Sequence, residues 1–149
     1  MSFLPDKPII IRSNFITKAV SWFFDVYTIN LYPFVVMKEH EETEGMTVGQ
    51  RYQAQLRDQR TIHHETIHMR QYKELWVVPL VFLYLWDWTI GLIKYRSAQK
   101  AYYRIRVEQE AYANQDKFQF YFDGKRHGKT YDKCYADTRE PFAWKKYKV

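Results

Sequence analysis

Residues 60–75 read RTIHHETIHMRQYKEL and contain the pattern H-E-x-x-H, with His64, Glu65 and His68 at its fixed positions. Positions i and i+4 of a helix point in the same direction, so the two imidazoles can converge on one ion. Glu65 can then reach a water molecule bound to that ion and act as a general base. A shuffled chain of this composition would contain the three fixed positions only about 0.01 times, so chance is a poor explanation.

The flanks of this pattern favour a helix. The range Thr61–Leu75 contains neither glycine nor proline, and Asp58 lies just upstream as a candidate N-cap. One helix face would carry five residues at spacings of three and four: His64, His68, Gln71, Tyr72 and Leu75. A metal ion would satisfy the polar groups of this face; the alternative is a histidine pair that only packs in the protein or faces solvent. His63 lies one step off the face, and we interpret it as structural or exposed.

The composition is that of a single folded domain over 1–149. The chain is long enough for a real core, and tyrosine, phenylalanine and tryptophan make up 19% of it. We expect the core over 8–122 and a basic, aromatic C-terminal extension over 123–149. The single cysteine, Cys134, excludes an internal disulfide and a cysteine-based zinc site. The first residues lack a secretory signal pattern, so we expect an intracellular protein or one held within a virion or other assembly.

The net charge of +6 is concentrated in this extension. Residues 124–149 hold eight Lys or Arg against three Asp or Glu. An attraction to nucleic acid, phospholipid or an acidic partner would therefore act mainly there. The simpler interpretation of such a tail is a solvated surface.

The first forty-five residues predict a short sheet and one helix. Residues 8–11 are β-branched, and residues 15–24 follow a Ser-Asn cap with an apolar helical pattern. Residues 27–37 are β-branched and aromatic, and we expect a strand that Pro33 keeps at an edge or a bulge. Such an edge beside the metal helix could hold an extended peptide by main-chain pairing. The acidic segment around His40, Glu39–Gly45, is either a second metal site or a solvated turn.

Residues 75–93 form a nineteen-residue apolar stretch with one charge, Asp87. This length is close to that needed to cross a bilayer, and the tryptophans suit a membrane interface. Asp87 divides the stretch, however, and Pro79 and Gly91 break it further. A buried hydrophobic helix, a hairpin at the membrane surface and a membrane span are the alternatives.

A second helix is expected over 101–114. Glu108 lies in the middle of an otherwise apolar face of this helix. A carboxylate aimed into a core needs a cationic partner, for which a metal ion is the natural candidate and an arginine such as Arg70 the alternative. Glu110 lies on a more polar face, where Asn114 could orient it.

The H-E-x-x-H pattern and the later EQEA at 108–111 together resemble the gluzincin branch of the zincin metallopeptidases, over roughly 61–114. The continuation to Gln71 also resembles small zincin-like proteins with H-E-x-x-H-x-x-Q and a hydrophobic segment before the glutamate helix. The resemblance implies a zinc ion held by three ligands, His64, His68 and Glu108, and a general base, Glu65. One position departs from the family pattern, because Tyr112 stands where Asp or Asn is usual. The pair Glu110 and Asn114 fits that spacing better, which keeps Glu110 as the alternative third ligand.

We therefore expect an α+β fold, a small zincin-like domain in which the active-site and glutamate helices pack beside a short, mostly antiparallel sheet. A hydrophobic helix or hairpin would lie between them. The expected function is a zinc-dependent hydrolase, most simply a metallopeptidase that acts on a peptide or protein. The alternative is a non-catalytic structural or cargo component of a larger assembly, such as a virion or a membrane complex. Contact with a membrane surface through 75–93 and nucleic-acid binding by the basic extension are further hypotheses.

Overall fold

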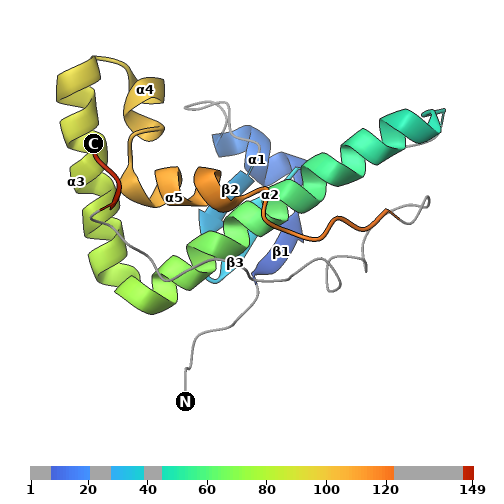
Figure 1. Cartoon of the computed structure of the whole chain (residues 1–149), viewed down its shortest axis with the longest axis horizontal. Helices are drawn as coiled ribbons and strands as arrows, with labels where there is room; N and C mark the ends of the chain where they lie inside the picture. The colour runs from blue at the N-terminus through green and yellow to red at the C-terminus, as the bar shows by residue number, and fades with distance from the viewer. Residues whose placement is uncertain (1–7, 21–27, 39–44, 123–145) are drawn as a thin grey trace.

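The structure is a computed structural model that describes residues 8–20, 28–38, 45–122 and 146–149. Its elements are, in order, β1 (Ile9–Arg12), α1 (Asn14–Val20), β2 (Thr28–Leu31), β3 (Phe34–Met37), α2 (Val48–Leu75), α3 (Val77–Tyr95), α4 (Ala98–Tyr102) and α5 (Arg106–Asn114). A small sheet lies beside the long helix α2, and α3, α4 and α5 gather at its C-terminal end (Figure 1). This arrangement confirms the α+β class. The proposed His40 site and most of the C-terminal extension lie outside the described residues.

The three strands form a mixed sheet in the order β1-β3-β2. β2 and β3 are an antiparallel hairpin whose turn contains Pro33, whereas β1 runs parallel to β3. The expectation of a mostly antiparallel sheet is therefore wrong for one of the two pairings, and the segment 27–37 contains two strands instead of one. β-Branched composition indicates a strand but carries no information on the direction of its neighbour. β2 lies at the sheet edge, as expected for part of this segment.

The sheet packs on α2 through a small apolar core. Val35 and Met37 of the central strand are buried against Ile62 of α2, and Ile10 packs on this cluster. Burial of each such side chain contributes about 1.5–3 kcal/mol to folding. At the end of β1, the guanidinium of Arg12 donates to the carboxylate of Asp58 at 2.9 Å. These contacts hold the sheet over the middle of α2.

The start of α2 differs from the expectation. The helix begins at Val48, where the side chain of Thr47 accepts from the backbone N–H of Gln50 and the Gln50 side chain accepts from that of Thr47. This reciprocal pair is a capping box, which satisfies two of the unpaired amides of the first turn. Asp58 is thus not an N-cap but an interior residue, and the polar segment 46–59 is mostly helical.

Residues 77–95 form one continuous helix, α3, and not a hairpin. Pro79 lies in the first turn, where a missing N–H costs no hydrogen bond. Gly91 does not break the helix either; a Cβ at this position would lie 2.9 Å from Ala101, so the glycine allows α4 to pack closely on α3. The helix is not buried, since only 17% of its apolar segment is enclosed by the rest of the protein. By length and composition it could cross a membrane.

The expected helix over 101–114 is divided into α4 and α5 by a turn at 103–105. Asp87 of α3 explains the division. Its carboxylate accepts from the backbone N–H of Arg106 at 3.0 Å and from the Arg106 guanidinium at 2.6 and 2.8 Å. A charge from a different helix therefore caps α5, and a second apolar cluster of Leu80, Ile105 and Val107 forms around this junction.

The described residues after α5 form hydrogen bonds with helices α2, α3 and α5. The amide of Gln59 pairs with the backbone of Tyr121 in both directions, at 2.6 and 3.0 Å. At the C-terminal end, the main-chain oxygen of Lys148 accepts from Gln109, and that of Val149 accepts from Lys94. The segment 118–122 thus follows α2, and residues 148–149 lie against α3 and α5.

Candidate metal centre

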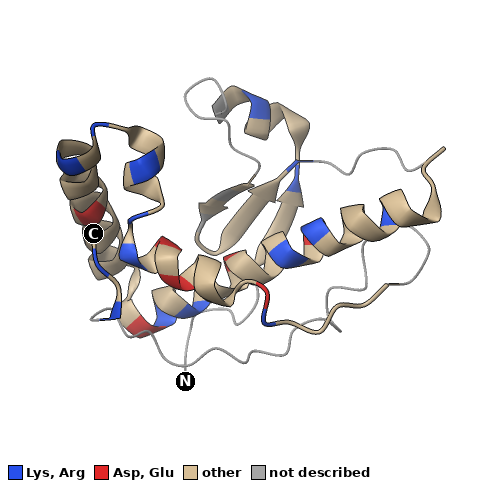
Figure 2. Cartoon of the chain, turned by 45° about the horizontal axis from the view of Figure 1, so that its top comes forward, with Lys and Arg blue, Asp and Glu red and all other residues tan. Residues whose placement is uncertain are grey.

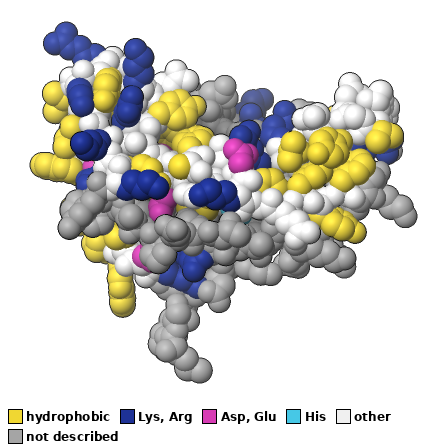
Figure 3. All heavy atoms as spheres, viewed as in Figure 1, with side chains coloured by type: hydrophobic (Ala, Val, Ile, Leu, Met, Phe, Trp, Pro, Cys, Tyr) yellow, Lys and Arg dark blue, Asp and Glu magenta, His cyan; other side chains and the backbone are white. Residues whose placement is uncertain are grey.

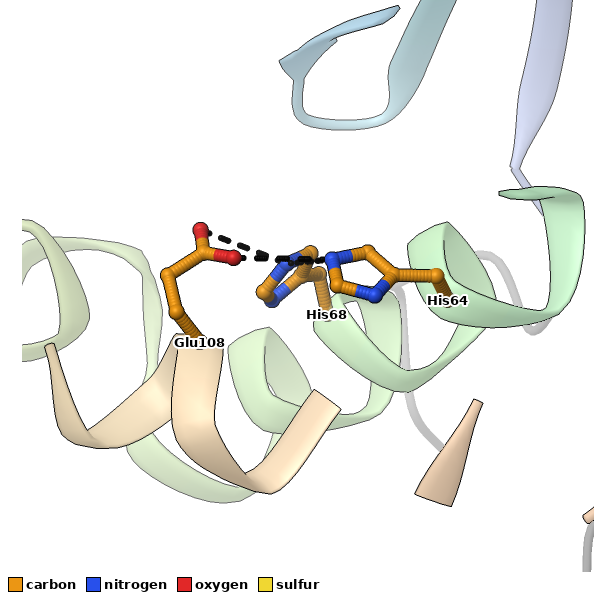
Figure 4. A group of neighbouring side chains, drawn as sticks. All are labelled: His64, His68 and Glu108. Atoms are coloured by element: carbon orange, nitrogen blue, oxygen red, sulfur yellow. Dashed lines mark hydrogen bonds and ion pairs between the residues drawn. The ribbon is translucent and has the colours of Figure 1, made fainter. Parts of the chain in front are cut away.

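Helices α2 and α5 bring His64, His68 and Glu108 together (Figure 4). The Nε2 atoms of the two histidines are 3.1 Å apart. Glu108 faces both of them, with one carboxylate oxygen 3.5 Å from Nε2 of His64 and the other 3.5 Å from Nε2 of His68. The one-turn spacing on α2 therefore converges as the pattern requires, and α5 supplies the third group.

These separations are close to those of a tetrahedral zinc site. Two nitrogen or oxygen ligands about 2.0–2.1 Å from a tetrahedral ion lie about 3.3 Å from each other. The two imidazole nitrogens are 3.1 Å apart, and each lies 3.5 Å from a different oxygen of Glu108. When each residue offers a single ligand atom, the three atoms lie within 4.8 Å of one another. Two imidazoles and one carboxylate are also a ligand set that zinc commonly takes, and a fourth position would remain for water or substrate.

Gln71 sets the tautomer of His68. The amide NH₂ of Gln71 donates to the main-chain oxygen of Val107 at 3.0 Å and to the carboxylate of Glu110 at 2.7 Å. Its amide oxygen must therefore be the atom that faces Nδ1 of His68, at 2.7 Å. In the neutral imidazole, which is the form that a metal ion binds, this assignment places the proton on Nδ1 and leaves the lone pair of Nε2 on the side of Glu108 and His64.

His64 is held in a similar way. Its Nδ1 lies 3.2 Å from the amide oxygen of Gln115, just beyond α5, which again leaves Nε2 for the centre. The ring of Tyr112 lies edge-on against the His64 imidazole, with ring centroids 4.7 Å apart. Tyr112, which departs from the gluzincin pattern, thus contacts one of the two candidate histidine ligands.

Tyrosines orient Glu108 instead. The hydroxyl of Tyr102, on α4, donates to Oε2 of Glu108 at 2.8 Å. The phenol of Tyr84, on α3, lies within the electrostatic influence of the same carboxylate. Burial and the negative charge of Glu108 raise the pKa of both tyrosines far above the usual value. Both hydroxyls therefore stay protonated and remain donors.

Glu65 is buried beside the centre and is anchored from the sheet. Asn30 of β2 donates its side-chain amide to Oε2 of Glu65 at 2.8 Å. This contact links the edge strand to the central glutamate of the motif. It also leaves Oε1 as the oxygen available for proton transfer.

The electrostatics of the centre call for a cation. Burial alone would lower the pKa of His68, but the facing carboxylate of Glu108 outweighs it and raises that pKa to about 9. Burial would raise the pKa of Glu108, yet His68 and His64 hold it well below its usual range. Three acceptor atoms that converge repel one another unless a proton or a metal ion lies among them.

The remaining candidates take other positions. Glu110, the alternative third ligand, is bonded to Gln71 behind His68 and is outside the group of three. Glu108 faces imidazoles and tyrosines where an ion pair with Arg70 was the alternative. His63 is buried against Phe118, with ring centroids 5.5 Å apart, in agreement with a structural role.

Sequence reasoning did not single out the supporting residues Asn30, Tyr84, Tyr102 and Gln115. Asn30 carries a detectable signal, because it is a polar residue within an apolar strand pattern. The tyrosines carry none, because the chain is rich in tyrosine and their positions depend on how α3 and α4 pack.

Comparison of the chain with protein-family models, with curated proteins and with solved structures finds no match in any of the three. The resemblance to gluzincins accordingly rests on the motif residues alone.

Proposed function

We propose that this protein is a zinc-dependent hydrolase whose substrates are peptides or proteins. The main support is the convergence of His64, His68 and Glu108, whose facing nitrogen and oxygen atoms are 3.1–3.5 Å apart, close to the spacing of zinc ligands. Zinc in such a site supplies Lewis-acid chemistry, because it lowers the pKa of water to about 7 and polarises a carbonyl group.

Glu65 is the residue that would move the proton. As a general base it accepts a proton from the attacking water at Oε1, while Asn30 holds Oε2. It then delivers the proton to the leaving amine. Hydrogen bonds would keep the three ligands in place during the two proton transfers. They join Gln71 to His68, Gln115 to His64 and Tyr102 to Glu108.

The edge strand β2 supports a peptide as the substrate. Its Asn30 contacts Glu65, so an extended peptide paired to this edge would pass beside the site. Among the described residues, the buried oxygens Oγ1 of Thr28 and Oδ1 of Asn30 have no hydrogen-bond partner. A donor of a bound peptide would satisfy them.

The decisive experiment separates metal binding from catalysis. Zinc content and peptide cleavage are measured for wild type, His64→Ala, Glu108→Ala and Glu65→Gln. We expect both alanine variants to lose zinc, and Glu65→Gln to keep zinc while cleavage falls by about 10²–10⁴-fold. Glu74→Gln, an exposed change on the same helix, is the matched control. Full cleavage by Glu65→Gln would refute the mechanism.

A second candidate function is a metal site without catalysis, in a component of a larger assembly. Its support is burial, since His64, Glu65, His68 and Glu108 are all at most 8% exposed, and structural zinc sites are closed. A wild-type protein that holds one zinc ion and cleaves nothing in a broad peptide library would favour this candidate over the hydrolase.

A further inference from the structure

Helix α3 turns large apolar side chains to solvent and its only acidic side chain inward, the reverse of what is expected for a surface helix in water. The only charged residue between 77 and 93, Asp87, is 0% exposed and is bonded to Arg106. The opposite side of the helix is apolar and faces outward. Its exposed residues are Val78, Val81, Phe82, Leu85, Trp86 and Ile93.

These residues form one continuous surface, which we call the outer face of α3. At about 100° per residue, they fall within a sector of about 140°, and Asp87 points nearly the opposite way. Phe82 is 70% exposed and Trp86 is 65% exposed, so large apolar side chains of this face are in contact with solvent. In Figure 3, hydrophobic side chains crowd the edge of the molecule where α3 lies. A face of this kind marks contact with an apolar medium or partner.

Positive charge adjoins the outer face. The segment 88–107 contains no Asp or Glu, and four of its basic residues are exposed: Lys94, Arg96, Lys100 and Arg104. They gather at the C-terminal end of α3 and on α4 (Figure 2). Trp76 and Tyr103, both exposed, add aromatic rings of the type found at the level of lipid headgroups. Apolar, aromatic and basic groups together match an anionic lipid surface better than an apolar protein groove.

The packing of α3 decides between lying on the membrane and crossing it. Its inner side is covered by α4 and α5, with Gly91 in close contact with Ala101. A span would carry α4, with its exposed Lys100, and the Asp87–Arg106 ion pair into the hydrocarbon, which is costly. An in-plane position exposes only the outer face to lipid.

We propose that the outer face of α3 docks on an anionic lipid bilayer, with the helix in the plane of the interface. The exposed basic residues of 94–104, at one end of α3 and on α4, then attract the anionic headgroups at longer range. The candidate metal centre stays on the side of α3 that faces the protein, since α5, which carries Glu108, packs on the inner side through Leu80, Ile105 and Val107. This proposal is independent of whether the centre is catalytic.

The test is flotation of the full chain with vesicles of phosphatidylcholine alone or with about one third phosphatidylserine. We expect binding to the anionic vesicles and about tenfold weaker binding after Phe82→Gln with Trp86→Gln. Phe15→Gln, an equally exposed apolar residue on α1, is the matched control and leaves binding unchanged. Lys100→Gln with Arg104→Gln weakens binding to anionic vesicles only, whereas Arg57→Gln on α2 has no effect.

Three results would overturn the proposal. The first is no binding of the wild type to either vesicle. The second is self-association of the wild type that the Phe82 and Trp86 changes abolish, because the face would then be an interface between copies of this chain. The third is protection of the middle of α3 alone. A fluorophore is attached to a single cysteine that replaces Val78, Leu85 or Ile93, in a Cys134→Ser background. The in-plane position predicts equal quenching of all three by a headgroup quencher, whereas protection at Leu85 only would show that the helix spans the membrane.

Discussion

The amide oxygen of Gln71 lies 2.7 Å from Nδ1 of His68, and this contact directs the other imidazole nitrogen at the metal centre. Gln71 is fully buried, and its NH₂ is fixed by Val107 and Glu110, so it cannot rotate to present a donor to the histidine. Hydrogen bonds from Glu110 through Gln71 to Nδ1 of His68 therefore fix the orientation of this candidate ligand. Such supporting groups commonly affect metal affinity strongly.

Gln71→Met should weaken zinc binding by about 10–100-fold, because His68 loses the acceptor that holds its tautomer and orientation. Competition with a chromogenic chelator measures the affinity. Gln55→Met changes a buried glutamine about four turns before Gln71 on α2; it is the matched control and should bind zinc as wild type does. Equal affinity in all three proteins would contradict the role assigned to Gln71.

Tyr102→Phe should reduce zinc affinity by about tenfold, since the carboxylate of Glu108 loses its 2.8 Å hydroxyl donor. The adjacent Tyr103→Phe alters a half-exposed ring and serves as the control. The same chelator competition reports the effect. If the two variants bind zinc equally, Tyr102 does not position Glu108.

Asp87→Asn should destabilise the protein by about 3 kcal/mol, because Arg106 loses its partner and α5 loses the charge at its first turn. Urea unfolding measures the free energy of unfolding. Asp116→Asn removes the partner of Arg60 in an exposed pair and should cost less than about 1 kcal/mol. Similar costs for the two variants would show that the Asp87 pair does not organise the junction.

The stability of the metal-free protein should fall as the pH rises from 6.5 to about 9. The pKa of His68 is raised from 6.5 to about 9 in the folded state, so its contribution is complete below 6.5 and is lost as the pH passes the folded value. One proton limits the slope to about 1.4 kcal/mol per pH unit. The pKa of Glu108 is lowered in the folded state, which has the opposite effect: stability is lost as the pH falls below about 4.5, the ordinary value for a glutamate.

Urea unfolding across this pH range tests the dependence, with His68→Gln as the comparison. The variant should lack most of the alkaline decline. Saturating zinc should also flatten it, because zinc binds the neutral imidazole that high pH favours. A decline that is unchanged in His68→Gln would assign the titration to another group.

Local sequence was sufficient for the first half of the candidate site. Two histidines four residues apart on a helix must point the same way, so His64 and His68 follow from the pattern itself. The start of α2 was predicted wrongly, at Asp58, although Thr47 and Gln50 have the spacing of a capping box. The α+β class followed from the change of hydrophobic period along the chain.

The second half of the site depended on tertiary packing. Periodicity favoured Glu108 and the family spacing kept Glu110 as the alternative, because the carboxylate that meets the histidines depends on where α5 begins. Asp87 of α3 decides that point by capping Arg106, and it thereby turns Glu108 toward the imidazoles and Glu110 toward Gln71. The direction of β1 and the outward position of the apolar side of α3 were likewise set by contacts between distant segments. Periodicity describes which residues share a face, but only the packing of the elements determines what that face meets.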